Sequence, residues 1–536
     1  PDEKPEFSTL SWFSLLFAAG MGIGLVFFGL TEPLMHFTSP RPDVAAANPT
    51  QAEAAQSALA TTFLHWGLQP WAIYAVVGVA VALAIHRRGR PLALRWAFEP
   101  LIGERRVRGG WGHLIDNIAL IGTVFGVATS LGLGVTQMSA GLRSLGIVPE
   151  DSPWLEYAMI GAVTCVVLYT VVSGVERGMK WLSNTNLILA AGLLLFIAIV
   201  GPTAFLFKEM VQSLGSYMQY FFANSLNVSA FYGAEGDAWQ AGWSAYYWGW
   251  WMSGTPFVGI FIARISRGRT IRSFIVAGLG LPTAFVIIWM GIYGYSAFQS
   301  DRATAPAPGQ GGDLTQTIVT DGNVQAALFQ HLQAMPLYTV AAVVALVVIT
   351  QFFITSIDSG ALVMDAMANG HEDPAPRRQS VFWAVSIGAV CAAIILTAGE
   401  NGLAALQEVI IVIGLPILLI TVTQAALLLQ ALREDAGAAR PMRPRQWKQV
   451  LPVAEYRRRA TEDGVDVSDF VIRPEFEVGT EPENDTHTPQ TWHQQRIDAA
   501  KALVTVGLTG GIAAGRTEVG AELERLGAVV VAFDDL

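Results

Sequence analysis

The sequence predicts an all-α membrane protein, because it is apolar, poor in charge and divided into long hydrophobic segments. Of its 536 residues, 52% are hydrophobic and only 14% are charged, and the mean hydropathy is +0.43. Soluble domains average about 25% charged residues, so this composition disfavours an ordinary soluble enzyme. Roughly one residue in ten is charged before Arg433, and roughly three in ten after it. The change divides the chain into a membrane-embedded body and a water-facing tail.

Ten hydrophobic segments are long enough to cross a bilayer core, which takes about 20 residues. They cover approximately residues 10–36, 58–86, 114–142, 155–174, 184–207, 240–265, 273–298, 337–366, 379–398 and 403–431. Arginine and lysine gather in the connections after the second, fourth, sixth and eighth segments. By the positive-inside rule, these connections, the N-terminus and the C-terminal tail are cytoplasmic.

The ten segments divide into two sets of five, and an odd number in each set inverts the second set relative to the first. The first segment contains Gly20, Gly22 and Gly24, and the sixth, its equivalent, contains Gly254 and Pro256. Glycine has low helix propensity and proline lacks a backbone donor, so we expect both helices to break in mid-membrane. A single glycine-rich stretch would more simply serve close helix packing. Two breaks at equivalent positions instead indicate a cavity lined by freed backbone.

The sixth segment also carries a dense aromatic cluster between Trp243 and Trp251. Tryptophan near the start of a span, such as Trp243, usually anchors the helix at the membrane interface. Trp248, Trp250 and Trp251 lie deeper, where aromatic faces can hold a methylated ammonium by cation–π attraction. The second segment offers three further aromatic side chains to the same cavity, namely Trp66, Trp71 and Tyr74.

Polar side chains in the eighth segment predict a cation site. Adjacent hydroxyls such as Thr355 and Ser356 usually bond back to carbonyls of their own helix. Beside a broken first helix, they are also oxygen ligands suited to a small alkali cation. Asp358 is a carboxylate within the membrane and so a candidate functional residue. Equally, it could pair with an arginine near the cytoplasmic end.

These motifs resemble the betaine/choline/carnitine transporter family. The resemblance covers about residues 8–432 and rests on Gly20 to Gly24, Thr31-Glu32-Pro33, His65-Trp66-Gly67, Tyr247 to Trp251, Pro256 to Gly259 and Ala263 to Gly268. It implies a twelve-helix transporter with an inverted five-plus-five core, which forms homotrimers among membrane lipids and moves quaternary ammonium solutes. Since the chain begins just before the third helix of this pattern, we expect two leading helices to be absent and the ten-helix core to be present.

The resemblance also implies a set of binding residues. The substrate site would consist of Trp66, Tyr74, Trp248, Trp250 and Trp251 with Gly20, Gly22 and Gly24. The sodium site would consist of Ala18, Met21, Phe352, Thr355 and Ser356, and a second ion site of Thr123 and Phe257. Two positions depart from the family pattern, because Gly254 replaces a further tryptophan and Val127 replaces a threonine. The first leaves the identity of the solute open, and the second removes one oxygen ligand from the second ion site, because valine supplies none.

These residues predict a secondary transporter, not an enzyme. We expect it to import a betaine-type compatible solute with sodium, by alternating access, across a bacterial-type cytoplasmic membrane for osmoprotection. Choline carriers of the family tend to have an aspartate at the position of Gly24, so a zwitterion should bind better than choline. The alternative within this class is a sodium-independent or proton-coupled carrier of choline, carnitine or ectoine. No cofactor beyond the coupling sodium is expected, and a net charge of −10 argues against a nucleic-acid partner.

The tail is predicted to have two parts. Residues 433–500 are polar and mixed in charge, with 13 Lys/Arg against 18 Asp/Glu after residue 432, and we expect a cytoplasmic tail. Residues 501–536 resemble the start of dephospho-coenzyme A kinase, because Gly510, Gly515, Arg516 and Thr517 form a phosphate loop with arginine in place of lysine. A membrane-anchored P-loop kinase is therefore the alternative from another class. So short a segment cannot build the core of a nucleotide-binding domain, so we expect an inactive stub.

Overall fold

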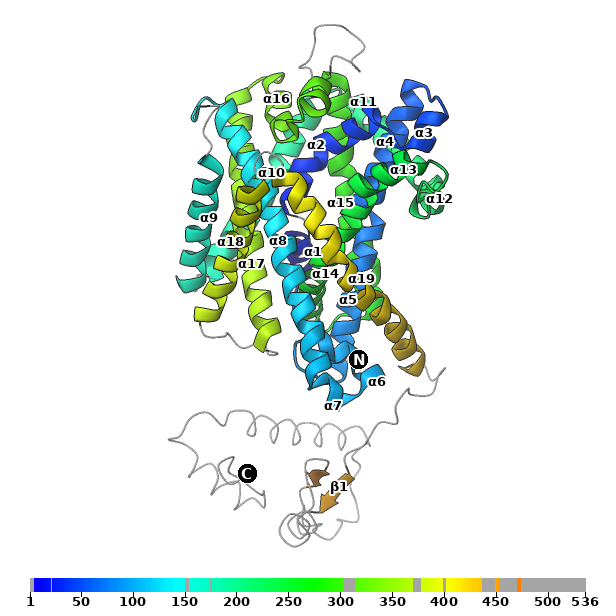
Figure 1. The fold of residues 1–536 in the computed structure, drawn as a ribbon, viewed down its shortest axis with the longest axis vertical. Helices are drawn as coiled ribbons and strands as arrows, with labels where there is room; N and C mark the ends of the chain where they lie inside the picture. Colours follow the sequence, from blue (N-terminus) through cyan, green and yellow to red (C-terminus); the bar gives the residue numbers. More distant parts are fainter. Residues whose placement is uncertain are drawn as a thin grey trace, which may run out of the picture. The chain divides into compact units, whose positions relative to one another are not determined.

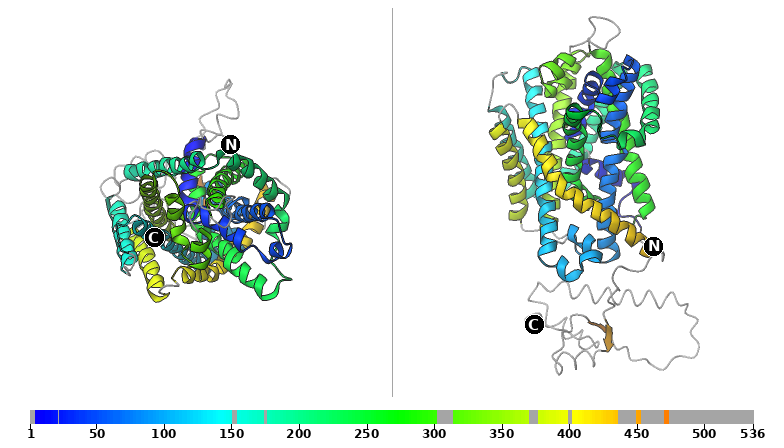
Figure 2. Two further views of the ribbon diagram at one scale, coloured as in Figure 1. Left: turned by 90° about the horizontal axis from the view of Figure 1, so that it is seen from above. Right: turned by 45° about the vertical axis from the view of Figure 1, so that its right-hand side comes forward.

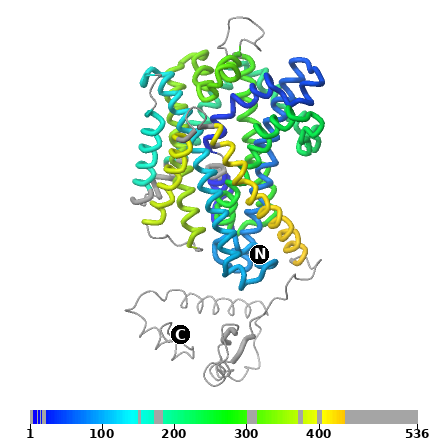
Figure 3. The backbone as a smooth tube through the Cα atoms, viewed as in Figure 1, coloured from blue at the N-terminus to red at the C-terminus, as the bar shows by residue number. Residues whose placement is uncertain are grey.

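A computed structural model describes residues 4–20, 22–149, 154–173, 176–301, 314–369, 377–398, 402–435, 449–452 and 470–473. Figure 3 traces the backbone through these ranges. The chain forms two compact units, Pro1–Met442 and Arg443–Leu536. The predicted boundaries after residues 432 and 500 remain predictions.

The first unit is built from helices. Its first half contains α1 (Thr9–Gly20), α2 (Ile23–Thr38), α3 (Pro42–Ala46), α4 (Gln51–Trp66), α5 (Leu68–Ala82), η1 (Leu83–Arg87), η2 (Leu94–Phe98), α6 (Glu99–Ile102), α7 (Glu104–Val107), α8 (Gly110–Ser144), α9 (Leu155–Ser173) and α10 (Glu176–Val200). Its second half contains α11 (Thr203–Gln219), α12 (Phe221–Ser225), α13 (Gly233–Gln240), η3 (Ala241–Ala245), α14 (Tyr246–Ile265), α15 (Ile271–Ser300), η4 (Gln316–Thr320), η5 (Val324–Ala326), α16 (Ala327–Gln333), α17 (Tyr338–Asn369), α18 (Arg377–Ala398) and α19 (Gly402–Asp435).

Each of the ten predicted segments is largely helical, but fewer qualify as complete spans. Within the described ranges, six helices are long and apolar enough to cross a bilayer, or seven if the bent pair α10 and α11 is one span. The predicted first span is divided into two shorter helices, and α9 is a shorter apolar helix. The structure is therefore that of an all-α, multi-pass membrane protein, while the count of ten spans and the inverted repeat remain predictions.

The interruption expected in the first span is present. Helix α1 ends at Gly20 and α2 begins at Ile23. Between them, Gly22 has φ −103° and ψ −142°, which is not a helical conformation. Met21 lies outside the described residues. The glycines thus divide this segment into two half-helices, as predicted.

The break expected in the sixth span is absent, so that prediction is wrong. Helix α14 continues from Tyr246 to Ile265 through Pro256. Hydroxyl groups bond to carbonyls in the turn before the proline, with Ser253 Oγ donating to Trp250 O and Thr255 Oγ1 to Trp251 O, both at 2.7 Å. The carbonyl that Pro256 deprives of its helical donor is that of Met252, which accepts neither of these bonds, and the helix continues while packed against α5, α8 and α19. The irregularity lies about three turns before Pro256, in the π-helical segment η3.

Two other breaks were not predicted. Gly67 separates α4 from α5 within the second span, and an added Cβ there would lie 2.4 Å from the carbonyl oxygen of Phe63. Only glycine fits so close an approach. After Gly201 the chain turns by 109° from α10 into α11. The connection expected between the fourth and fifth spans is also shorter than predicted, because α10 already begins at Glu176.

Helix α14 lies at the centre of the packing. It contacts α5, α8, α19 and η3, and α2 packs against α4, α8 and α15. Both views in Figure 2 show the helices of this unit gathered into one bundle. Helices α9 and α18 pack side by side at its edge (Figure 1). The half-helix α2 and the aromatic-rich α14 are thus held in the interior.

In the second unit, the described residues form a short parallel pair of strands. Strands β1 (Gln449–Pro452) and β2 (Phe470–Arg473) pair with Gln449 opposite Phe470. The predicted kinase-like segment, residues 501–536, lies outside the described residues.

Candidate functional site

A cavity opens beside the break between α1 and α2. It is lined by residues of α2, α4, α5, α8, α14 and α17 and by the junction residue Gly22. Of the predicted substrate residues, those on its wall are Gly22, Gly24, Trp66, Tyr74, Trp250 and Trp251. The wall also includes Gly254, Val127, Phe257 and Ser356. The structure therefore brings together residues that are far apart in the sequence.

The aromatic side chains form a box with walls at right angles. The rings of Trp250 and Trp251 stack with centroids 5.4 Å apart and planes 11° apart. Trp66 stands perpendicular to both, at 6.0 Å and 85° from Trp250 and at 5.1 Å and 83° from Trp251. Tyr74 meets Trp251 edge to face at 5.9 Å. Several aromatic rings around one cavity can attract a cation that cannot donate hydrogen bonds.

Glycine at position 24 is required by the approach of the box to α2. A Cβ added to Gly24 would lie 2.6 Å from Trp66 and 2.7 Å from Trp250. These separations are far below a normal carbon contact, so both indoles would have to move. By contrast, the one described group that a Cβ added to Gly254 would meet is the Tyr74 hydroxyl, at 3.4 Å. The cavity is thus tight at α2 and open where the family resemblance implied a further tryptophan.

Several predicted substrate residues are not on the cavity wall. Trp248 is half-buried and meets His65 edge to face, with ring centroids 5.9 Å apart. Trp71 is buried behind the box and packs on Tyr74. Gly20 is the last residue of α1, and its surroundings lie outside the described part of the chain.

The predicted sodium residues are partly described. Ser356 lies on the cavity wall, with its Oγ 3.2 Å from a Cβ added to Gly22, so α17 reaches the break in the first span. Thr355 Oγ1 donates to the carbonyl oxygens of Gln351 and Phe352, at 2.9 and 3.1 Å. A hydroxyl that donates its hydrogen keeps its lone pairs available for a cation. Ala18 belongs to α1 and Met21 to the break, and the surroundings of both lie outside the description.

At the predicted second ion site, Thr123 and Phe257 are both buried. Thr123 Oγ1 donates to Ala119 O at 2.8 Å. Phe257 and Val127 line the cavity, and the valine side chain offers no oxygen. Of the Thr123, Val127 and Phe257 side chains, that of Thr123 therefore supplies the one oxygen.

Asp358 is buried within α17 and bonded to a neighbouring helix. The hydroxyl of Thr170, in α9, donates to its Oδ1 at 3.0 Å. Among the described contacts, Asp358 is therefore bonded to a threonine hydroxyl and not to an arginine. Asp358 does not line the cavity beside the break.

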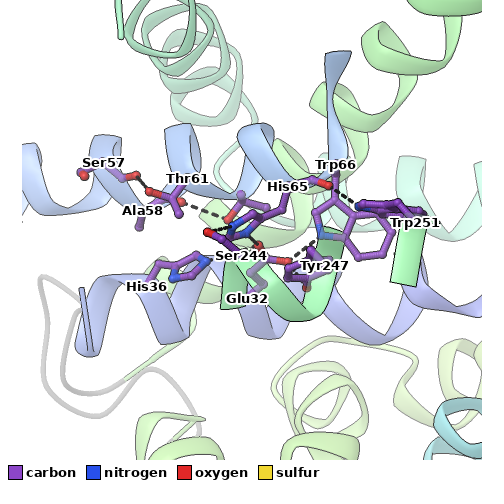
Figure 4. A network of polar contacts seen from close by, with 11 residues as sticks. Glu32, His36, Ser57, Ala58, Thr61, His65, Trp66, Ser244, Tyr247 and Trp251 are labelled. Atoms are coloured by element: carbon purple, nitrogen blue, oxygen red, sulfur yellow. Dashed lines mark hydrogen bonds and ion pairs between the residues drawn. The ribbon is translucent and has the colours of Figure 1, made fainter. Parts of the chain in front are cut away.

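Sequence reasoning assigned no role to Glu32, although the structure places it beside the box (Figure 4). Its side chain is fully buried and bonded to four others. The Thr-Glu-Pro motif at Thr31 was a signal for it, because a carboxylate inside a membrane helix is rarely accidental.

The fold and this site define a membrane transporter. A multi-pass helical body encloses a small aromatic cavity at a broken helix, and the residues around that cavity form no recognised catalytic arrangement. Residues 1–437 match the betaine/carnitine/choline family transporter (BCCT). The chain belongs to this family, and it is a transporter and not an enzyme.

Individual relatives agree with this assignment. An uncharacterized transporter of Mycobacterium tuberculosis is 43% identical over 481 residues, which cover 89% of this chain and 78% of the relative. The ectoine/glycine betaine/proline transporter of Corynebacterium glutamicum is 39% identical over 84% of this chain and 71% of the relative. A glycine betaine transporter of Acinetobacter baylyi is 39% identical over 84% of this chain and 67% of the relative.

Proposed function

We propose that this transporter imports a betaine-type zwitterion and couples its movement to sodium. The observation that carries the substrate proposal is the pairing of an aromatic box with the start of a half-helix on one cavity wall. Relatives named for glycine betaine, ectoine and proline transport support the same class of solute.

The two ends of such a zwitterion match the two parts of the site. A methylated ammonium fits among Trp66, Trp250 and Trp251, where it is held by cation–π attraction. The N-terminus of α2 opens on the same cavity, and its cap residue Gly22 has no side chain that could cap the helix. Free amide groups and the helix dipole there favour a carboxylate.

Charge supports a zwitterion over choline. Among the described residues that line the cavity, none has a charged side chain. A net cation such as choline would therefore meet no negative charge on the cavity wall itself, and the Glu32 carboxylate behind Trp66 is already bonded to Trp66, Tyr247 and His65. A zwitterion brings its own carboxylate and is neutral overall.

The open space beside Gly254 bears on which zwitterion is carried. Among the described residues, a Cβ at that position would approach Tyr74 alone within 4 Å. A ring-shaped solute such as ectoine or proline can use space that linear glycine betaine leaves empty. We therefore propose a box that accepts both linear and cyclic zwitterions.

Sodium coupling is proposed from the meeting of the α1–α2 break with α17. Ser356 approaches Gly22 across this junction, and Thr355 and the Phe352 carbonyl lie within one turn of Ser356. Hydroxyl and carbonyl oxygens are suitable ligands for sodium. An ion between the two elements stabilises the docked state, so ion and solute would shift the same conformational equilibrium.

The experiment is uptake of labelled glycine betaine into proteoliposomes under an inward sodium gradient. We expect uptake to depend on sodium, to fall when potassium replaces it, and to be inhibited by ectoine and proline more strongly than by choline. Sodium-independent uptake would refute the coupling proposal, and equal inhibition by choline would refute the charge argument.

Orientation and assembly are further parts of this proposal. The loop before α8 carries Arg87, Arg88, Arg105 and Arg106, all exposed, and on the positive-inside rule it faces the cytoplasm with both termini of the chain. We also expect a homotrimer in the inner membrane. Site-specific cysteine labelling in sealed vesicles tests the orientation, and light scattering in detergent tests the trimer.

A further inference from the structure

The carboxylate of Glu32 is bonded on both oxygens. Oε2 accepts from Trp66 Nε1 at 2.6 Å and from the Tyr247 hydroxyl. Oε1 lies 2.8 Å from His65 Nδ1 and 3.3 Å from His36 Nε2 (Figure 4). Among the described residues, no lysine or arginine pairs with this carboxylate, which is held by donors on aromatic and imidazole rings.

These bonds reach the aromatic box by two routes. Trp66 is itself a wall of the box and donates directly to Glu32. Trp251, the perpendicular wall, donates from Nε1 to the backbone oxygen of His65 at 2.8 Å. The His65 ring bonds Glu32 through one nitrogen and Ser244 Oγ, at 3.1 Å, through the other. One buried carboxylate thus ties α2 to α4, η3 and α14.

We propose that Glu32 is the residue that positions the aromatic box and makes its shape depend on the docking of α2. An indole has one hydrogen-bond donor, so the acceptor it meets fixes the rotation of the ring. A carboxylate is the strongest such acceptor. If α2 moves away from α4 and α14, Trp66 and Tyr247 lose this acceptor together. This inference rests on the proposed function, because it assigns the box to solute binding.

Glutamine and leucine at position 32 separate hydrogen bonding from shape. Glu32→Gln keeps an oxygen that can accept from Trp66 and Tyr247. Its amide group can donate to His65 Nδ1 if the imidazole carries its hydrogen on Nε2 and donates it to Ser244. Glu32→Leu has a similar size but no acceptor, which leaves the buried donors of Trp66 and Tyr247 unsatisfied.

The matched control is Ser213→Ala. Ser213 is buried and bonded to the Tyr295 hydroxyl at 2.6 Å, between α11 and α15, and neither residue lines the cavity. This variant removes a buried hydrogen bond between helices without touching the Glu32 contacts. It therefore shows how much KM changes when a buried hydrogen bond between helices is lost away from the box.

The test measures uptake of glycine betaine and the near-ultraviolet circular dichroism of the purified protein. We expect Glu32→Leu to raise KM about tenfold or more with less than about a threefold change in Vmax. Glu32→Gln and Ser213→Ala should stay within about threefold of the unmutated KM. The dichroism of the stacked indoles should change in Glu32→Leu and stay unchanged in Ser213→Ala.

The outcomes that overturn the inference are distinct. An unchanged KM and spectrum in Glu32→Leu would show that the box does not depend on this residue. Equal loss in Glu32→Gln would show that the charge acts on the solute directly. If Glu32→Leu does not fold, Tyr247→Phe, which removes one donor, must raise KM by more than about threefold and by more than Ser213→Ala does for the inference to hold. If the unmutated chain takes up no glycine betaine, the proposed function fails, while the dichroism still tests the positioning.

Discussion

Alanine at position 24 should disrupt solute binding through a steric contact of known size. An added Cβ would lie 2.6 Å from Trp66 and 2.7 Å from Trp250, whereas carbon atoms in contact are about 3.5 to 4.0 Å apart. Each indole would have to retreat by roughly 1 Å, away from the face where the ammonium is held. Alanine favours helix over glycine by about 1 kcal/mol, so the change does not weaken α2 through helix propensity.

The expected magnitude follows from the two rings that move. A desolvated cation–π contact is worth up to about 2 kcal/mol, and partial loss of two such contacts amounts to a roughly tenfold to hundredfold rise in KM. The control is Gly254→Ala, which makes the same chemical change on the same cavity wall but meets only Tyr74 at 3.4 Å. We expect its KM for glycine betaine to change less than about threefold.

The assay is concentration-dependent uptake in proteoliposomes, with the amount of folded transporter measured by size-exclusion chromatography. An unchanged KM in Gly24→Ala, or an equal loss in Gly254→Ala, would refute the assignment of this cavity to the solute. The contact also revises the charge argument for Gly24→Asp. The added carboxylate would suit choline, but its Cβ meets the same two indoles, so we expect loss of both solutes instead of a switch.

Three further predictions address the box, the ion site and a loop outside the membrane. Trp251→Leu removes one cation–π contact of roughly 1 to 2 kcal/mol, so the KM for glycine betaine should rise about tenfold, and unchanged uptake would contradict the box. Replacing Thr355 and Ser356 with alanine should raise the sodium concentration for half-maximal uptake, whereas Thr350→Ala, which loses a similar bond to its own helix, should not. Burial would raise the pKa of Asp43, but Arg41 and a hydrogen bond from Asn227 outweigh it and lower that pKa. The stabilising contribution of the Asp43 carboxylate is therefore present above its unfolded-state pKa and is lost as the pH falls through its folded-state pKa. Asp43→Asn should lower thermal stability at pH 7 and have little effect at strongly acidic pH. Thermal unfolding in detergent at both pH values checks this prediction.

Local chemistry was enough to predict the membrane body and the break in the first span. A long apolar segment must be helical in a bilayer, because every backbone group needs an internal partner. The glycines around Gly22 cannot supply the helix propensity to continue such a helix. The aromatic residues of the box could also be named from the sequence, because no interface explanation suits tryptophan so deep in a span.

The same local reasoning failed where packing contacts decide the conformation of a residue. Pro256 was expected to break its helix, but α14 continues through it while packed against α5, α8 and α19. Trp248 was expected in the box beside Trp250 and Trp251, but it packs against His65 and does not line the cavity. The break at Gly67 depends on the approach of Phe63 O and Tyr217, which the sequence does not reveal.

The amino-acid sequence alone was sufficient for properties that each segment has regardless of its neighbours, which are hydrophobicity, helix propensity and the supply of aromatic rings. The arrangement of Glu32 is of a different kind, because Trp66, His65 and Tyr247 are about 30 to more than 200 residues away along the chain. A buried carboxylate loses its hydrogen bonds to water, so it needs protein donors that packing brings within about 3 Å. For that reason the residues of the box could be predicted from composition and motif, while the groups that hold the box in shape became visible only once the helices were packed.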